Sequence, residues 1–168
     1  MPADQGLSES LENYLEVILD LERTQKVARA KEIADRLQIQ PGSVTGALKN
    51  LAEKGYINYE PYSYITLTAK GRQWAEEITY RHQALSNFFL NVLQVDAATA
   101  EETACRMEHA IDRQTIDQLV RFIDYIFTCP RAGQEWIQAF ADFCAAGGRK
   151  KADCELCIQS IQSPQPRK

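Results

Sequence analysis

The chain has 168 residues, of which 45% are apolar and 25% charged, and it contains only eight glycines. This composition is typical of a helix-rich protein large enough to bury a core. No run of about 18 uncharged apolar residues occurs, and the first ten residues lack the order of a signal peptide, so we expect a cytoplasmic protein without a membrane span. In that compartment, five cysteines are more typical of metal binding or free thiols than of disulfides.

The net charge of -4 is unevenly distributed along the chain. Residues 23–72 contain nine Lys/Arg and four Asp/Glu, whereas the remainder contains ten and nineteen. A locally basic segment on an acidic body favours DNA binding by that segment alone.

The first predicted elements form a helix-turn-helix. An amphipathic helix is predicted over residues 8–25, a short helix over 31–37, and a third helix from Pro41 to about Lys54, because proline suits a first helical turn. We expect the third helix to read DNA. The predicted DNA-binding residues are Lys31, Gln40, Pro41, Ser43, Thr45, Lys49 and Asn50.

Two short β-rich runs follow, at residues 56–60 and 64–68, around Pro61-Tyr62-Ser63. They predict a β-hairpin, which would be the wing of a winged helix. A small helical bundle with an incidental hairpin is the alternative, although the order of the parts favours the winged helix.

Three further helices are predicted: from Ala69, capped by Thr68, to about Leu93, then over 97–112, then from Asp112 onward. Their apolar stripes predict a dimer surface, although the core of a monomer would show the same pattern.

The second of these helices carries Cys105, Glu108 and His109 at i, i+3 and i+4, which places them on one helical face. A thiolate, a carboxylate and an imidazole at this spacing are suitable ligands for a transition metal. His82, on the preceding helix, could supply a further ligand. The alternative is a small buried cysteine beside two solvated polar residues.

The C-terminal tail is rich in cysteine. Cys129, Cys144, Cys154 and Cys157 have the spacing C-x14-C-x9-C-x2-C. Four thiolates could hold a structural Zn(II), or alternatively an iron–sulfur cluster, and free thiols are the third interpretation.

Residues 7–127 resemble the metal-dependent repressors of the diphtheria-toxin-repressor and manganese-transport-regulator (DtxR/MntR) family. The motifs that carry the resemblance are Glu12-Asn-Tyr-Leu-Glu16, Ser43-Val-Thr45, Tyr59-Glu-Pro-Tyr62, Leu67-Thr-x-Lys-Gly71, Arg81-His82 and Cys105-x-x-Glu-His109.

The resemblance implies a mainly α fold, with a winged-helix DNA-binding domain over 1–72, an all-α metal-binding and dimerisation domain over 73–127, and a cysteine-rich tail over 128–168. It also implies a repressor that binds a palindromic double-stranded DNA operator as a homodimer when a divalent metal bridges the two domains. We expect no enzymatic activity and no small-molecule substrate. The implied metal ligands are Asn13, Glu16, His82, Cys105, Glu108 and His109.

The chain departs from the family pattern at two positions. Asn13 stands where iron-type members have methionine and manganese-type members have aspartate, and Ser86 replaces a glutamate of the ancillary metal site. Cys105 is an iron-type feature and Glu16 a manganese-type one, so Fe(II) is favoured and Mn(II) comes next.

Three alternatives remain open from the sequence. One is a winged-helix regulator that senses redox state or an iron–sulfur cluster through the tail cysteines. Another is an enzyme with Cys105 as nucleophile and His109 as base, and the last is an architectural DNA-binding protein.

Overall fold

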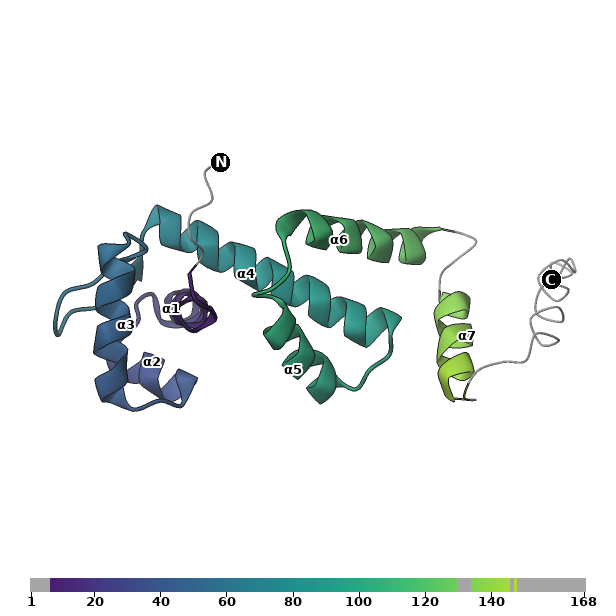
Figure 1. Ribbon diagram of the computed structural model, residues 1–168, viewed down its shortest axis with the longest axis horizontal. Helices are drawn as coiled ribbons and strands as arrows, with labels where there is room; N and C mark the ends of the chain where they lie inside the picture. Colours follow the sequence, from purple (N-terminus) through teal and green to yellow (C-terminus); the bar gives the residue numbers. More distant parts are fainter. Residues whose placement is uncertain (1–6, 130–133, 146, 148–168) are drawn as a thin grey trace, which may run out of the picture.

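The computed structural model describes residues 7–129, 134–145 and 147, so Cys154 and Cys157 lie outside the described residues. The chain is mainly helical and begins with a winged helix, as the sequence predicts (Figure 1). In chain order the elements are α1 (Glu9–Gln25), α2 (Ala30–Leu37), α3 (Pro41–Glu53), β1 (Ile57–Asn58), β2 (Thr66–Leu67), α4 (Ala69–Asn87), the π-helical turn η1 (Phe88–Val92), α5 (Ala97–Met107), α6 (Arg113–Thr128) and α7 (Gln134–Ala145).

The N-terminal half forms around one hydrophobic core. Pro41 begins α3, and Val44, Leu48 and Leu51 of this helix are fully buried. The hairpin is antiparallel and pairs Ile57 with Leu67, although its strands are shorter than the β-rich runs of the sequence. The predicted helix-turn-helix and wing are therefore confirmed.

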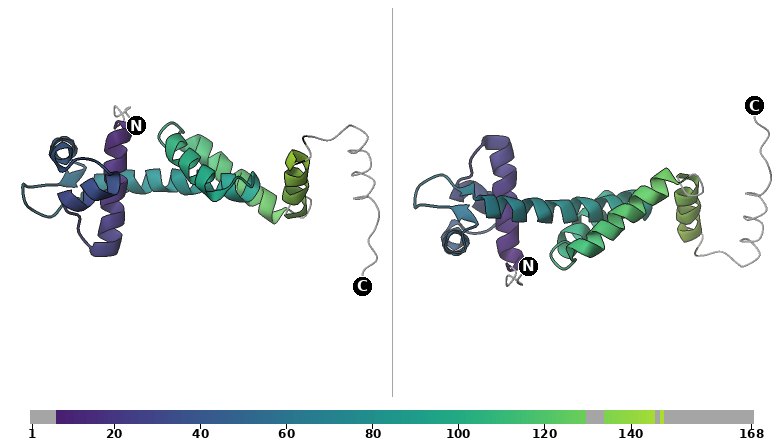
Figure 2. Two further views of the ribbon diagram at one scale, coloured as in Figure 1. Left: turned by 90° about the horizontal axis from the view of Figure 1, so that it is seen from below. Right: turned by 90° about the horizontal axis from the view of Figure 1, so that it is seen from above.

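Helix α4 runs from the winged helix into the C-terminal half (Figure 1), and α1 crosses it in both views of Figure 2. The Thr68 hydroxyl caps α4 by accepting the Gly71 N–H. The sequence predicts a regular helix to about Leu93, but α4 ends at Asn87 and continues as the π-helical turn η1.

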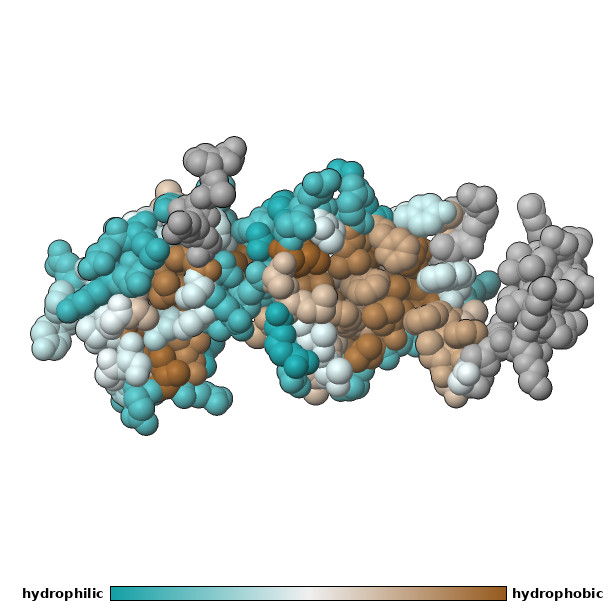
Figure 3. All heavy atoms as spheres, viewed as in Figure 1, coloured by the Kyte–Doolittle hydropathy of each residue, from teal (hydrophilic) through white to brown (hydrophobic). Residues whose placement is uncertain are grey.

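The C-terminal half contains α5, α6 and α7. Asp96 and Asp112 cap α5 and α6 by accepting hydrogen bonds from the backbone N–H groups of Thr99 and Thr115. Helix α5 ends at Met107, so the prediction of helix through residue 112 is wrong for its last turn. Ile137 of α7 packs into a small core with η1 and α6, and Figure 3 shows hydrophobic residues gathered over this half.

Glu22, near the end of α1, connects this helix to the wing. Its carboxylate accepts the Leu67 N–H of β2 at 2.8 Å and an Arg72 N–H of α4 at 2.5 Å. The N-terminal end of α4, the base of the wing and α1 are therefore held together by one buried carboxylate. Among the described residues, no helix is long and apolar enough to cross a membrane.

Candidate metal centre and nucleic-acid interface

Three predicted ligands converge where α1 passes the end of α5. One donor atom each of Glu16, Glu108 and His109 lies within 4.8 Å of the other two. Glu16 belongs to the N-terminal half, whereas Glu108 and His109 follow α5 in the C-terminal half. The Glu108 side chain is 1% exposed and that of His109 is 7% exposed. The site therefore joins the two halves and is largely closed to solvent.

The two carboxylates face each other in this buried site. Burial, followed by the neighbouring Glu108 carboxylate, raises the pKa of Glu16 to about 8. Glu16 is therefore protonated at neutral pH without a cation, because two buried like charges cannot both be ionised at low cost. A divalent cation would remove this repulsion and displace the proton.

The buried Nε2 atom of His109 supports this interpretation. It lies 3.3 Å from Glu108 Oε1, yet it has no hydrogen-bond partner, and it is the one such buried side-chain nitrogen or oxygen in the described part of the chain. A bare imidazole nitrogen beside two carboxylates is a nitrogen–oxygen donor set suitable for Mn(II), Fe(II) or Zn(II). The residues present therefore fit a divalent metal.

His82 lies at the edge of this group. Its Nδ1 is 2.5 Å from Glu108 Oε2, and its Nε2 is 3.1 Å from Glu101 Oε1. The hydrogen bond to Glu108 raises the pKa of His82 to about 9, against the opposing effect of burial. His82 is thus an imidazolium between two carboxylates, and it must lose a proton before it can ligate a metal. Glu101 was not predicted, because its spacing does not match the Cys105-x-x-Glu-His motif.

Cys105, a predicted ligand, lies outside the group formed by Glu16, Glu108 and His109. Cys105 is an exposed residue, and partial desolvation of its thiol, followed by the charge of the nearby Glu108, raises the pKa of the thiol. Asn13 lines a groove between α1 and the helix-turn-helix, together with Ser43. Asn13 therefore lines the same groove as a predicted DNA-reading residue.

Glu12 is a buried carboxylate that was not predicted from the sequence to belong to the site. Its side chain bonds His109 Nδ1 at 2.6 Å and accepts the Trp74 indole N–H at 3.0 Å. The available signal was its position one helical turn before Glu16, on the same face of α1.

The nucleic-acid interface combines α3 with the wing. The predicted α3 contacts Ser43, Thr45, Lys49 and Asn50 are all exposed, as are Gln40, Pro41 and Lys31. Thr45 and Lys49 line a groove of 740 Å³ that the wing closes on the other side. Tyr62, at the tip of the wing, is fully exposed and has a positive φ of 65°.

Arg29 is a further basic residue in the α3–wing groove, and it too was not predicted from the sequence. Its guanidinium lies 5.1 Å from the centre of the Tyr64 ring and donates to the Tyr64 hydroxyl at 3.4 Å. The wing thus holds an arginine at the mouth of the groove, where a phosphate could bind it.

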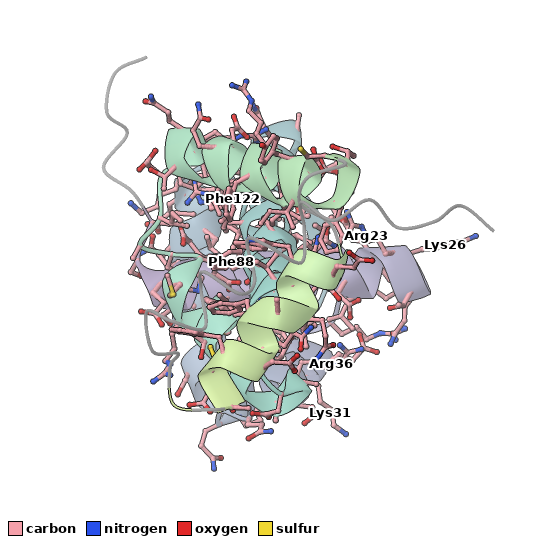
Figure 4. The ribbon with its side chains drawn as sticks, turned by 90° about the vertical axis from the view of Figure 1, so that its right-hand side faces the viewer. Arg23, Lys26, Lys31, Arg36, Phe88 and Phe122 are labelled. Atoms are coloured by element: carbon pink, nitrogen blue, oxygen red, sulfur yellow. The ribbon has the colours of Figure 1, made fainter. Side chains whose placement is uncertain are left out.

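A second group of basic side chains projects from α1 and α2. Figure 4 shows Arg23, Lys26, Lys31 and Arg36 on one side of the molecule. Arg36 is paired with Asp20 at 2.7 Å, which neutralises part of this surface.

The comparisons with known proteins cover both halves of the chain. The family model of the iron-dependent repressor N-terminal DNA-binding domain matches residues 6–65, and that of the metal-binding and dimerisation domain matches residues 68–137. An uncharacterised helix-turn-helix transcriptional regulator from Methanocaldococcus jannaschii is 38% identical over 119 residues, which are 70% of this chain and 95% of the relative. The transcriptional regulator MntR of Shouchella clausii is 34% identical over 116 residues, or 69% of this chain and 80% of MntR.

Among solved structures, the manganese regulator SloR is similar, with a TM-score of 0.62 and 25% identity over 71% of this chain. The chain spans little more than half of SloR, at 56% of its length. The two family models together cover the winged helix and the segment that contains Glu108 and His109. The chain therefore belongs to the iron-dependent repressor (DtxR/MntR) family, the metal-dependent transcriptional repressors with an N-terminal DNA-binding domain and a metal-binding and dimerisation domain.

Proposed function

We propose that this repressor binds its operator when a divalent metal, Mn(II) or Fe(II), is held between α1 and the residues after α5. The observation that carries the proposal is the convergence of Glu16, Glu108 and His109 across the two halves, with a buried His109 nitrogen that lacks a partner. His82, Cys105 and Asn13 complete the proposed ligand set. His82 would lose a proton and exchange one carboxylate partner for the metal, whereas Cys105 would need a movement of its side chain.

The metal would supply a positive charge that links the two halves. Glu16 would hold α1, while Glu108 and His109 would hold the dimerisation half. This link would favour one orientation of the winged helix relative to the C-terminal half over the others. The metal can shift this equilibrium only by as much as its affinities for the different orientations differ. A palindromic operator needs two recognition helices about 34–36 Å apart, so a fixed orientation favours binding.

We propose a homodimer formed through the C-terminal half. Phe122, Tyr125 and Phe127 of α6 are large hydrophobic residues that remain substantially exposed in the single chain. Phe88 lies close to Phe122, with ring centres 6.5 Å apart (Figure 4). Aromatic residues exposed side by side are typical of a protein–protein interface.

The DNA contacts divide into two kinds. Lys31 and Lys49 would bind phosphates, whereas Ser43, Thr45 and Asn50 would contact base edges. Gln40 and Pro41 would place the start of α3 against the DNA backbone, where a helix N-terminus favours a phosphate.

The choice of metal depends on Cys105. Glu16, Glu108 and His109 offer oxygen and nitrogen donors that suit either metal, and the similarity to SloR, a manganese regulator, favours manganese. A thiolate from Cys105 would instead favour the softer Fe(II) over Mn(II). We therefore expect Cys105→Ser to shift the preference toward Mn(II), measured by anaerobic titration of operator binding with Fe(II), Mn(II) and Zn(II).

The test of the metal site is operator binding by Glu108→Gln and His109→Ala. Both variants should remain folded dimers but lose the increase in operator affinity that metal produces in the wild-type protein. Glu102→Gln is the matched control, because Glu102 is an exposed carboxylate on α5 whose side chain is 73% accessible. Wild-type metal dependence in either site variant would show that these residues do not form the regulatory site.

A second metal site in the tail is a further proposal. Cys129 is the C-cap residue of α6, and Cys144 lies in α7. Together with Cys154 and Cys157 they could hold Zn(II), or a cluster as the second choice. Metal content per monomer should fall in a Cys154→Ser/Cys157→Ser variant purified without oxygen. Unchanged metal content and unchanged visible absorbance would exclude both a zinc ion and a cluster at these cysteines.

A further inference from the structure

Glu12 brings three separate elements together beside the proposed metal site. Its carboxylate, from α1, contacts His109 after α5 and Trp74 of α4. The side chains of Glu12 and His109 are each only 7% exposed. Burying a carboxylate is costly unless its oxygens are satisfied, so these two contacts account for its presence in the core.

The two hydrogen bonds occupy different oxygens of Glu12. The Trp74 indole N–H donates to Oε1 at 3.0 Å, and Oε2 lies 2.6 Å from His109 Nδ1. With the Glu12 oxygen as acceptor, Nδ1 is the donor of this bond, and a histidine that ligates a metal does so as a neutral imidazole. The lone pair of the ring is then on Nε2, which is the buried nitrogen without a partner.

We propose that Glu12 and Trp74 are positioning residues of the metal site: Glu12 fixes the ring and tautomer of His109, and Trp74 fixes Glu12. This inference rests on the proposed function of His109 as a ligand. A carboxylate on the far nitrogen of a ligating histidine orients the ring and increases its basicity, and its loss typically lowers metal affinity by about 10–100-fold.

The role of Trp74 is separable from its packing. Its ring packs edge-on against Tyr56, with centres 6.1 Å apart, and phenylalanine would preserve much of that contact. Trp74→Phe therefore removes the N–H donor while it leaves an aromatic ring. Trp136→Phe makes the same change on α7, where the side chain is 47% exposed and stacks on Phe140.

A glutamine at position 12 would place an N–H₂ donor against one of the two donors that Glu12 accepts from, and this mismatch tests the proposed role of Glu12. Glu12 presents two acceptors to two donors, but Glu12→Gln presents one acceptor and one N–H₂ donor. Either His109 or Trp74 must then face a donor. In the double variant Glu12→Gln/Trp74→Phe the indole donor is gone, so the amide oxygen is free to accept from His109 Nδ1.

The experiment measures Mn(II) affinity, with manganese chloride alone, and the His109 tautomer by ¹⁵N NMR of the metal-free protein. We expect Glu12→Gln to weaken Mn(II) binding about 10–100-fold, Trp74→Phe to weaken it less, and the double variant to bind better than Glu12→Gln. The metal-free wild-type protein should carry the His109 proton on Nδ1, and Glu12→Gln should increase the fraction on Nε2. Trp136→Phe should match the wild-type protein in both measurements.

Several results would overturn the inference. Wild-type Mn(II) affinity in both single variants would do so, as would a wild-type protein with the His109 proton on Nε2. An equal loss of affinity in Trp136→Phe would show a general effect of the substitution. If Glu12→Gln does not fold, Trp74→Phe tests the inference alone: the folded variant must bind Mn(II) more weakly than the wild-type protein, and wild-type affinity would overturn the inference. Failure of the proposed function is a different result: the wild-type protein would bind no Mn(II), while the tautomer measurement would still decide whether Glu12 orients His109.

Discussion

Gly71→Ala tests the close contact between α4 and the base of the wing. A Cβ atom at residue 71 would lie 1.9 Å from the Tyr56 carbonyl oxygen and 2.8 Å from its carbon. Both are backbone atoms, so no side-chain rotation can relieve the overlap. The Tyr56 oxygen also accepts from the Thr68 backbone N–H at 3.0 Å and from its hydroxyl at 3.1 Å, and these bonds would be disturbed.

The expected change in the free energy of unfolding follows from one stabilising and two destabilising effects. Alanine normally gains about 1 kcal/mol over glycine inside a helix. Overpacking costs about 1–3 kcal/mol, and weakening two hydrogen bonds costs about 0.5–1.5 kcal/mol each. We therefore expect Gly71→Ala to lower the free energy of unfolding by about 1–5 kcal/mol, with a fall in melting temperature of about 2–4 °C per kcal/mol.

Gly46→Ala is the matched control for this prediction. Gly46 is also helical, in α3, but a Cβ there would meet nothing within 4 Å. It should therefore raise the free energy of unfolding by up to about 1 kcal/mol. Thermal unfolding of the metal-free proteins, followed by circular dichroism, measures both changes. A stabilisation by Gly71→Ala equal to that of Gly46→Ala would refute the close contact.

Three further predictions concern metal and DNA binding. Mn(II) affinity should rise with pH toward about 9, because Glu16 and His82, with pKa values of about 8 and about 9, must each lose a proton to bind metal. Calorimetry in buffers of different ionisation enthalpy counts the protons that are released. A metal-binding reaction that releases no proton at pH 7 would contradict this prediction. Asn13→Asp should favour Mn(II) and Asn13→Met should favour Fe(II) or Co(II) in operator-binding titrations, whereas identical rankings would place Asn13 outside the coordination shell. Lys49→Ala should weaken binding to operator and unrelated DNA alike and reduce the salt dependence of log K by about 1, measured by fluorescence anisotropy; an unchanged slope would exclude a phosphate contact.

The raised pKa values of Glu16 and His82 make the metal-free protein less stable as the pH rises, whereas they make metal binding stronger. Both groups have a folded pKa above their ordinary values of 4.5 and 6.5. The folded chain therefore binds more protons than the unfolded chain between about pH 4.5 and 9, and the free energy of unfolding should fall as the pH rises through this range.

The winged helix could be predicted from sequence because its signals are local. Pro41 marks the start of α3, and Thr68 marks the start of α4 by a side-chain cap. The buried face of α3 follows from helical spacing alone. The proposed division at residues 72 and 127 stays a prediction, as do the ligand and DNA-contact assignments.

The site itself was harder to predict because its geometry depends on where α5 ends. The spacing of Cys105, Glu108 and His109 places them on one face only while the helix continues. The helix ends at Met107, and the N–H groups of both Ala110 and Ile111 are directed at the Met107 carbonyl. The turn leaves Glu108 buried and Cys105 exposed. The contact of Glu12 with His109 spans 97 positions, which no local pattern can predict.

Through the contacts of Glu22, helix α1 connects the proposed metal site rigidly to the wing. Glu16 and Glu22 are six residues apart on one continuous helix, so they are separated by about 9 Å along its axis. Glu22 grips the backbone of β2, and α2 and α3 pack on the same helix. A tilt of α1 at Glu16 would therefore move the recognition helix and the wing together with it. A Glu22→Gln variant would weaken the contacts of α1 with β2 and Arg72 while leaving every proposed metal ligand in place.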